Sequence, residues 1–211
     1  MSELKGLIKE VIDITTISKE EHNGMLPYIE TYMGLRLYYN NITPESISIF
    51  DIAHALSQIC RFTGHTKEFY SVAQHSVLVC DAQETVREQR AGLLHDASEA
   101  YVNDLPSPMK SCINLGDYKL LENQVHAAIN TKFMVNDGMT PNIKKADLRA
   151  LFTEKRDVVM SNIPYEWGKD IKPFDDIIIP LQPKEAEKLF LDTFARLFPI
   201  EYADELLIYK K

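Results

Sequence analysis

The chain of 211 residues contains no long apolar run, since no stretch approaches the roughly 18 apolar residues that suggest a membrane span. Residues 1–5 show no charged segment followed by an apolar one, so a signal peptide is not indicated either. The three cysteines, Cys60, Cys80 and Cys112, are odd in number and far apart, which argues against a disulfide framework. These absences predict a cytoplasmic protein with reduced thiols and no membrane partner.

Positive charge is also scarce. Lys and Arg number 23 against 31 Asp and Glu, which gives a formal net charge of -8. A protein that binds duplex nucleic acid usually carries a basic stripe, and none is evident, so polymeric nucleic acid is not an expected partner. A metal ion and a few local cations can still neutralise the phosphates of a small molecule. Small phosphorylated molecules therefore remain candidate ligands.

The sequence shows neither an internal repeat nor a low-complexity linker. Its hydrophobic fraction of 45% and charged fraction of 26% are ordinary for a globular protein, and its length is sufficient for one good core. We expect a single domain over residues 1–211. Residues 1–30 would form an N-terminal extension, and the core would span about residues 31–200.

Helical periodicity dominates from residue 53 onward and predicts an all-α fold. The expected helices span residues 53–62, 71–83, 87–101, 117–135 and 143–161, with a last helix that begins at Pro183. Residues 3–14 are weakly helical in pattern. Residues 34–52 are rich in β-forming residues and suggest a small N-terminal β-hairpin or two extended segments. Pro106 and Pro108 are expected to stop the third helix and to force an irregular loop.

The most informative segment is Leu94-His95-Asp96-Ala97-Ser98-Glu99. An adjacent His-Asp pair can direct a nitrogen and an oxygen at one metal ion. On a helix, the spacing would place His95, Asp96 and Glu99 on one face. A cation, Lys110, follows a short distance later. A metal pair, a free carboxylate and a cation are the parts of a phosphohydrolase that activates water.

Further metal ligands can be sought on neighbouring helices. His75 lies on a helix whose other face is apolar, and Asp147 lies in a helix that is otherwise apolar around it. From the sequence alone, Asp117, Asp137 and Asp157 are alternatives to Asp147. Two imidazoles and two carboxylates suit zinc, manganese, cobalt or iron, whereas magnesium prefers ligands that are all oxygen.

Other polar residues have simpler interpretations. His54 is expected to be a buried, hydrogen-bonded structural histidine, and His22 and His126 to be ordinary surface or helix residues. The charged run at residues 154–157 is expected to be a solvated helix face. His65 follows Gly64 in a loop, from which it could reach a substrate.

At this point the sequence resembles a known family, the HD-domain phosphohydrolases, which are named for the His-Asp pair. The resemblance covers roughly residues 30–200 and is strongest over residues 51–110. It is closest to the branch with bacterial 5′-deoxynucleotidases of the YfbR type and phage dATP triphosphohydrolases of the DatZ type. The motifs that carry it are Asp51-Ile52-Ala53-His54-Ala55-Leu56-Ser57, Cys60-Arg61-Phe62, Ser71-Val72-Ala73-Gln74-His75-Ser76, Leu93-Leu94-His95-Asp96-Ala97-Ser98-Glu99 and Asp104-Leu105-Pro106-Ser107-Pro108-Met109-Lys110.

The resemblance implies a fold, an HD-domain helical bundle, and a role for each matching residue. A divalent transition metal, zinc, cobalt or manganese, would be held by His75, His95, Asp96 and Asp147, and a second ion could bridge to the substrate. Glu99 would be the general acid/base, with Asp104 close to the phosphate. The substrate would contact Arg61, Phe62, His65, Pro108 and Lys110. Phe62 stands where relatives often carry Trp, so base selectivity does not carry over.

The implied reaction is metal-assisted hydrolysis at the α-phosphorus of a deoxynucleotide. The leading expectation is a dATP triphosphohydrolase that releases deoxyadenosine and triphosphate. It would deplete dATP in a phage with 2-aminoadenine DNA, in the host cytoplasm. The alternative is a 5′-deoxynucleotidase that acts on monophosphates, which would differ in whether helpers such as Lys67 and Lys119 bind the outer phosphates. A module that only binds would not need the free carboxylates of Glu99 and Asp104. The resemblance also suggests a homo-oligomer, a dimer or a hexamer.

Overall fold

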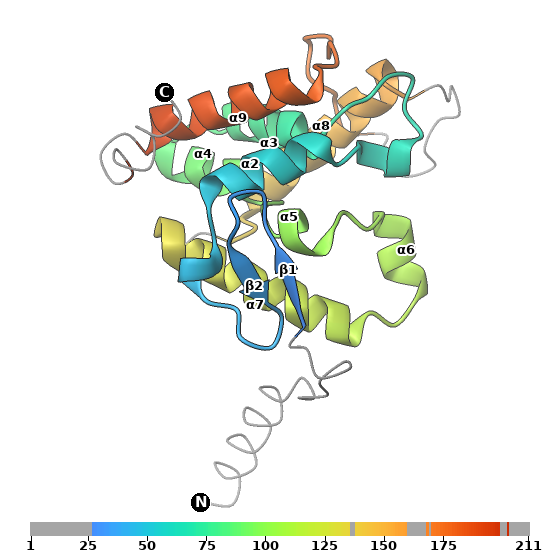
Figure 1. Cartoon of the computed structure of the whole chain (residues 1–211). Helices are drawn as coiled ribbons and strands as arrows, with labels where there is room; N and C mark the ends of the chain where they lie inside the picture. The colour runs from blue at the N-terminus through green and yellow to red at the C-terminus, as the bar shows by residue number, and fades with distance from the viewer. Residues whose placement is uncertain (1–26, 136–137, 160–167, 169, 199–201, 203–211) are drawn as a thin grey trace, which may run out of the picture.

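The computed structural model describes residues 27–135, 138–159, 168, 170–198 and 202, and over these residues the protein is mostly helical (Figure 1). The elements are β1 (Tyr28–Glu30), β2 (Arg36–Tyr38), the 3-10 turn η1 (Pro44–Ser46), α2 (Ile49–Gln58), the 3-10 turn η2 (Arg61–Gly64), α3 (Val72–Asp81), α4 (Val86–Leu93), α5 (Glu99–Val102), α6 (Ser107–Cys112), α7 (Gly116–Phe133), α8 (Pro141–Asp157) and α9 (Pro183–Leu197). The predicted all-α fold with a small hairpin is confirmed. No helix in the described part of the chain is long and apolar enough to cross a membrane. The expected helix at residues 3–14, His22 and Asp137 lie outside the described residues.

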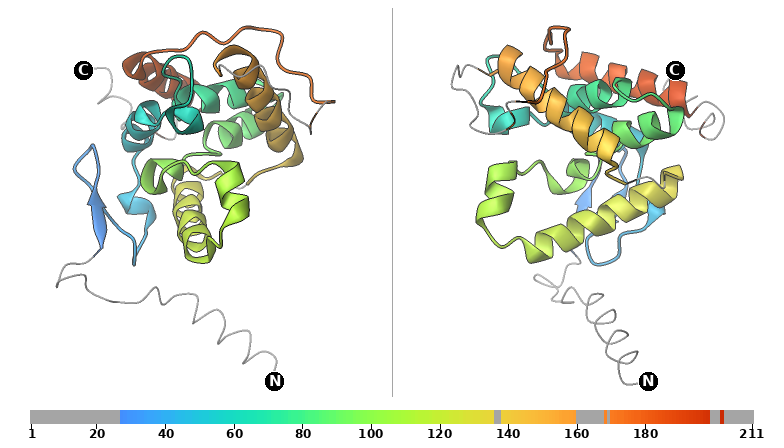
Figure 2. Two further views of the ribbon diagram at one scale, coloured as in Figure 1. Left: turned by 90° about the vertical axis from the view of Figure 1, so that its right-hand side faces the viewer. Right: turned by 180° about the vertical axis from the view of Figure 1, so that it is seen from behind.

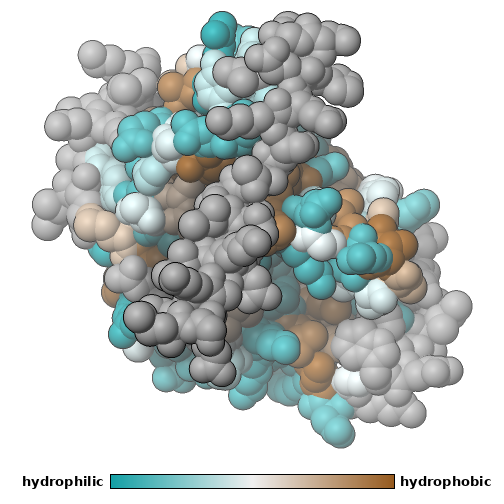
Figure 3. Space-filling view, turned by 90° about the horizontal axis from the view of Figure 1, so that it is seen from below, coloured by the Kyte–Doolittle hydropathy of each residue, from teal (hydrophilic) through white to brown (hydrophobic). Residues whose placement is uncertain are grey.

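The helices form two layers. Helix α3 contacts α2, α4, α8 and α9, and these five helices make the upper layer in Figure 1. Helix α7 runs beneath them with α5 and α6, and the hairpin lies beside this lower layer (Figures 1 and 2). Seen from below, hydrophobic residues appear as separate areas among hydrophilic ones (Figure 3). The two layers thus bring α3, the connection from α4 to α5, and α8 close to one another.

Helix α3 is the central element of the upper layer. Its N-cap is Ser71, whose hydroxyl accepts a hydrogen bond from the Gln74 backbone N–H at 3.2 Å. Val72, Val79 and Cys80 are fully buried, because neighbouring helices cover α3 on several sides. A polar residue in the middle of this helix, such as His75, is therefore held inside the protein.

The hairpin and the first helix differ from the sequence-based expectation. The strands pair Tyr28–Glu30 with Arg36–Tyr38, and helix α2 already begins at Ile49, inside the segment that was expected to be extended. Ser48 caps this helix by accepting a hydrogen bond from the Phe50 N–H. Because both Phe50 and the residues around it are buried, the start of α2 lacks the exposed polar face that marks a surface helix.

The predicted helix over residues 87–101 is wrong, since it is two helices, α4 and α5, separated by a turn at residues 94–98. Leu94 and Ala97 are buried in this turn, so the apolar periodicity continues through it without a break. The irregular loop expected at the prolines is also partly wrong. Residues Ser107–Cys112 form the short helix α6, with Pro108 in its first turn, where proline removes no helical hydrogen bond.

Candidate metal centre

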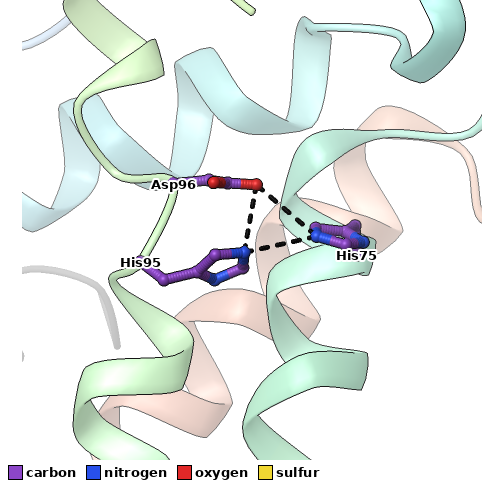
Figure 4. A group of neighbouring side chains, drawn as sticks. All are labelled: His75, His95 and Asp96. Atoms are coloured by element: carbon purple, nitrogen blue, oxygen red, sulfur yellow. Dashed lines mark hydrogen bonds and ion pairs between the residues drawn. The ribbon is translucent and has the colours of Figure 1, made fainter. Parts of the chain in front are cut away.

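Two histidines and an aspartate converge between α3 and the turn after α4 (Figure 4). His75 Nε2 lies 3.3 Å from His95 Nε2 and 3.5 Å from Asp96 Oδ2. His95 Nε2 lies 3.1 Å from Asp96 Oδ2. These three residues, which we call the metal cluster, direct one atom each toward a common point.

The turn at residues 94–98 explains how His95 and Asp96 can meet. Adjacent residues of an α-helix point about 100° apart, so they do not face each other. The expectation that His95, Asp96 and Glu99 share one helix face is therefore incorrect. The helix ends at Leu93, and the turn lets two neighbouring side chains point at one place.

The hydrogen bonds of the two imidazole rings leave their Nε2 atoms directed at the cluster. His95 Nδ1 lies 2.7 Å from the Gly92 carbonyl oxygen, which can only accept, so this nitrogen carries the proton. His75 Nδ1 lies 2.6 Å from Glu154 Oε1. Burial would raise the pKa of Glu154, but Arg61 and His75 lower it to about 2, so this carboxylate is also an acceptor. In its neutral form, each ring would therefore present an Nε2 lone pair to the cluster, which is the form that binds a metal ion.

The spacing and chemistry of these atoms fit a metal ion. Two ligand atoms that are each about 2.1 Å from a tetrahedral ion lie about 3.4 Å apart. The distances within the metal cluster, from 3.1 Å to 3.5 Å, agree with this value. Two imidazole nitrogens and one carboxylate oxygen are suitable ligands for a transition metal. The buried group of His75, His95 and Asp96 could thus hold a metal ion.

Asp147, the fourth expected ligand, lies at the edge of the cluster. Its Oδ1 is 3.3 Å from His75 Nε2, although it does not belong to the compact three-residue group. Among the alternatives, Asp157 is paired with Arg156 at 2.6 Å, and Asp117 lies in the first turn of α7. The structure thus brings Asp147 to His75 and leaves Asp157 engaged elsewhere.

The electrostatics of the cluster favour a cation. Burial and Arg61 lower the pKa of His75, but Glu154 and Asp147 outweigh them, and the pKa is raised to about 9. Burial would raise the pKa of Asp96, but His95, His75 and Arg61 hold it far below its usual range. Carboxylates that stabilise an imidazolium in this way would equally stabilise a metal ion at the same position.

Glu154 is the main residue that sequence reasoning misplaced. We expected it on a solvated helix face, but it is fully buried and contacts both His75 and Arg61. It lies seven residues after Asp147, which is two helical turns. This spacing was the available signal, because it places both carboxylates on the same side of α8.

Arg61 lies beside the cluster in a pinned loop. Its backbone N–H donates to the Tyr70 carbonyl, and Lys67 N–H donates to the Val158 carbonyl at the end of α8. The guanidinium donates through Nη2 to Glu154 at 2.9 Å, while Nη1 is 3.9 Å from Asp96 Oδ2. Arg61 is therefore held next to a metal ligand.

Phe62 and His65, which were also expected to contact the substrate, belong to the same loop as Arg61. Phe62 has a φ of 54°, in the left-handed region, and its ring lies 5.7 Å from the Arg61 guanidinium carbon. Thr63 and Gly64 continue in the same conformation, at φ angles of 55° and 81°. His65 is exposed directly after this turn. Left-handed conformations of this kind are costly for residues other than glycine and are often found at functional sites.

Glu99 is the first residue of α5 and is 6% exposed. Its Oε2 atom is buried and has no hydrogen-bond partner among the described residues. Burial, followed by the charges of Asp96 and Asp104, raises the pKa of Glu99 well above its usual range. Without a bound cation, this carboxyl group therefore keeps its proton at neutral pH.

A hollow of about 440 Å³ opens beside Glu99. It is also lined by His95, Asp96 and Lys110, and Lys110 Nζ lies 3.1 Å from Glu122 Oε1. Sequence reasoning missed His126, which lines the hollow and was expected to be an ordinary helix residue. Burial lowers the pKa of His126.

Asp104 and Pro108 lie on the approach from α5 to α6. Asp104 is half-buried, and burial raises its pKa. It follows Asn103, whose φ of 71° makes the sharp turn out of α5. Pro108 is exposed and does not line the hollow beside Glu99.

His54 was expected to be buried and hydrogen-bonded. It does contact Glu187, with 3.2 Å between Nδ1 and Oε2, but 31% of its side chain is exposed. Its ring stacks on Tyr32, with 3.8 Å between the ring centroids. The expected hydrogen bond is present, and the expected burial is not.

The fold and the site define a mostly helical protein with a buried two-histidine, one-aspartate group that could hold a metal. The chain is similar to the uncharacterized protein YfdR of Escherichia coli strain K12, with 39% identity over 173 residues, covering 80% of this chain and 94% of YfdR. It therefore belongs to the same protein family as YfdR. It is also 37% identical over 121 residues to the uncharacterized protein RCAP_rcc00048 of Rhodobacter capsulatus, covering 54% of this chain and 61% of that protein. No protein-family model matches the chain.

Proposed function

We propose that the chain is a metal-dependent HD-domain phosphohydrolase that acts on deoxynucleotides. The observation that carries this proposal is the metal cluster, in which two Nε2 lone pairs and one carboxylate oxygen lie 3.1–3.5 Å apart. Glu99, whose Oε2 atom has no hydrogen-bond partner among the described residues, and Lys110 line the hollow next to it. A site that only binds a metal needs neither of these groups.

Each side chain has a role in hydrolysis at the α-phosphorus. His75, His95 and Asp96, with Asp147, would hold a divalent ion, for which zinc, cobalt and manganese are the candidates. Such an ion would lower the pKa of the attacking water and polarise the phosphoryl group. Water oxygen forms the new bond to phosphorus, the bond from phosphorus to O5′ breaks, and a proton ends on O5′. Glu99 transfers this proton, with Asp104 nearby, while Arg61 and Lys110 stabilise the phosphate oxygens.

The sequence resemblance indicates dATP as the first substrate to test, with deoxyadenosine and triphosphate as products. One observation favours the alternative, a 5′-deoxynucleotidase. Lys110 is the one lysine or arginine among the described residues that line the hollow, and it already contacts Glu122. A triphosphate carries more negative charge than a monophosphate and needs more cations, or a second, bridging divalent ion.

The two substrates can be separated directly. The purified protein, loaded with manganese or cobalt, is incubated with dATP, dGTP, dAMP and the triphosphate of 2-aminoadenine deoxynucleoside, and the products are resolved by chromatography. We expect release of the nucleoside with either triphosphate or inorganic phosphate. If monophosphates alone are consumed, the protein is a 5′-deoxynucleotidase and the triphosphohydrolase proposal fails. If no substrate is consumed, the phosphohydrolase proposal fails.

A further inference from the structure

Glu154 bridges two residues that have different tasks in the proposed function. Oε1 lies 2.6 Å from His75 Nδ1, and Oε2 accepts a hydrogen bond from Arg61 Nη2 at 2.9 Å. Glu154 and His75 are fully buried, and 13% of the Arg61 side chain is exposed. Each oxygen of one carboxylate thus serves a different partner, in a place where water does not compete.

The contact with His75 determines which nitrogen faces the metal cluster. An acceptor at Nδ1 keeps the proton on that atom and leaves the Nε2 lone pair free, and it also holds the ring in its orientation. Partners of this kind commonly contribute a factor of 10–100 to metal affinity. Helix α8 also carries Asp147, whose Oδ1 lies 3.3 Å from His75 Nε2, so the same helix places a carboxylate oxygen near each ring nitrogen of His75.

The contact with Arg61 determines where the guanidinium points. Because Nη2 is bound to Glu154, Nη1 is turned toward the cluster, 3.9 Å from Asp96 Oδ2. That distance is too long for a hydrogen bond, so Nη1 keeps its capacity to donate to a phosphate oxygen at the metal. A buried Arg without a carboxylate partner would be costly, so Glu154 also stabilises its charge.

We propose that Glu154 is a positioning residue that couples metal binding to phosphate binding: it orients His75 toward the metal and Arg61 toward the substrate phosphate. The inference rests on the proposed function. Glu154 itself contacts neither the metal nor the substrate. Loss of Glu154 should therefore weaken metal binding, which His75 carries out, and phosphate binding, which Arg61 carries out.

The test variant is Glu154→Gln, which keeps the size of the side chain and removes its charge. An amide has one acceptor oxygen and no charge, so one of the two N–H donors that face position 154 loses its partner and the other loses its charged acceptor. We expect Co²⁺ affinity to fall about 10–100-fold, with a changed visible absorption spectrum of the bound Co²⁺. The inhibition constant of inorganic phosphate, and KM, should rise about tenfold, as for a lost charge-assisted hydrogen bond.

Two comparison variants separate the effects. Arg61→Ala should raise the phosphate constant at least as much while changing Co²⁺ affinity less than Glu154→Gln does. Glu68→Gln, at an exposed carboxylate in the loop before α3, should leave both unchanged. If Glu154→Gln binds Co²⁺ and phosphate as the unmodified protein does, the inference is overturned. If Co²⁺ affinity alone changes, the arginine half is overturned, and if the unmodified protein binds no Co²⁺, the proposed function fails instead.

A measurement on the unmodified protein covers the case in which Glu154→Gln does not fold. In the zinc-loaded protein labelled with ¹⁵N, long-range proton–nitrogen spectra of the imidazole rings report which nitrogen carries the proton. We expect His75 to carry it on Nδ1, and we expect the ¹H chemical shift of this proton to be the one typical of a strong hydrogen bond to a carboxylate. A proton on Nε2 of His75 would contradict the inference without any variant.

Discussion

The metal cluster and the segment from Asn103 to Glu122 both line the hollow beside Glu99, and they are held in different ways. The residues of the cluster are fixed by hydrogen bonds between distant parts of the chain, such as that from His75 to Glu154 at 2.6 Å, and they are largely buried. The 103–122 segment is mostly exposed and is held by contacts within itself, such as Lys110 to Glu122 and Tyr118 to the Asn103 carbonyl. The first region is preorganised, and the second can adapt.

This difference suggests a division of labour. A metal site needs ligand atoms held within a few tenths of an ångström, which a packed interior can supply. A substrate contact such as Lys110 gains from mobility, because its charge can follow the phosphate. Substitutions in the cluster should therefore act on metal content and on turnover, whereas those in the 103–122 segment should act on substrate affinity.

The largest effect is expected from Asp96→Ala. It removes the carboxylate oxygen from the three converging ligand atoms and leaves the two imidazoles with Asp147 at the edge of the site, so the metal should be lost together with all measurable turnover. Elemental analysis of the purified variant provides the measurement. Asp175→Ala, at a surface aspartate whose side chain is 83% exposed, should retain the metal. Full metal content in Asp96→Ala would show that the cluster is not the metal site.

Glu99→Ala should separate metal binding from chemistry. The residue contacts no ligand atom in the cluster, so metal content should stay the same, while turnover should fall by about 10²–10⁴-fold, as for a lost general acid/base. Single-turnover rates and metal stoichiometry on the same sample test this. Activity within tenfold of the unmodified protein would rule out the assigned role.

Lys110→Ala should affect the adaptable region alone. We expect KM to rise about tenfold with a smaller change in kcat and no change in metal content, because one charge-assisted contact to phosphate is lost. Lys184→Ala, at an exposed lysine in α9, serves as the control. A larger loss with dATP than with dAMP would indicate that Lys110 binds the outer phosphates, and equal losses would place it at the α-phosphate.

The smallest effect is expected from Ser71→Ala, which removes the N-cap of the helix that carries His75. The lost hydrogen bond to Gln74 N–H should cost about 1 kcal/mol and lower Tm by about 2–4 °C. Ser107→Ala in α6, a helix without a side-chain cap, should change Tm less. Thermal unfolding followed by circular dichroism compares the two. Equal changes in Tm for the two variants would contradict the inference that the metal cluster is held more firmly than the 103–122 segment.

Local features of the sequence were sufficient for most of the fold. Helices α3, α7 and α9 begin within a few residues of their predicted starts, because Ser71 and Pro183 mark helix starts and α7 has regular apolar spacing. The break between α4 and α5 was not predicted. Leu94 and Ala97 continue the helical periodicity there, and neither glycine nor proline marks the turn.

The sequence by itself also pointed to His75, His95 and Asp96, because these residue types suit one metal ion, and the structure brings these three together. The choice of Asp147 followed from the family resemblance, and Asp147 as a ligand and Glu99 as the general acid/base stay predictions. The sequence alone could not identify Glu154 as the carboxylate that contacts His75 Nδ1. A Glu in a charged run at the end of a helix reads as solvated, and Glu154 is buried since the loop of Arg61 and helix α3 cover it from distant positions in the chain. Burial and hydrogen-bond partners depend on such long-range contacts. They decide whether a carboxylate is a surface charge or part of a site, and here only the tertiary structure could show it.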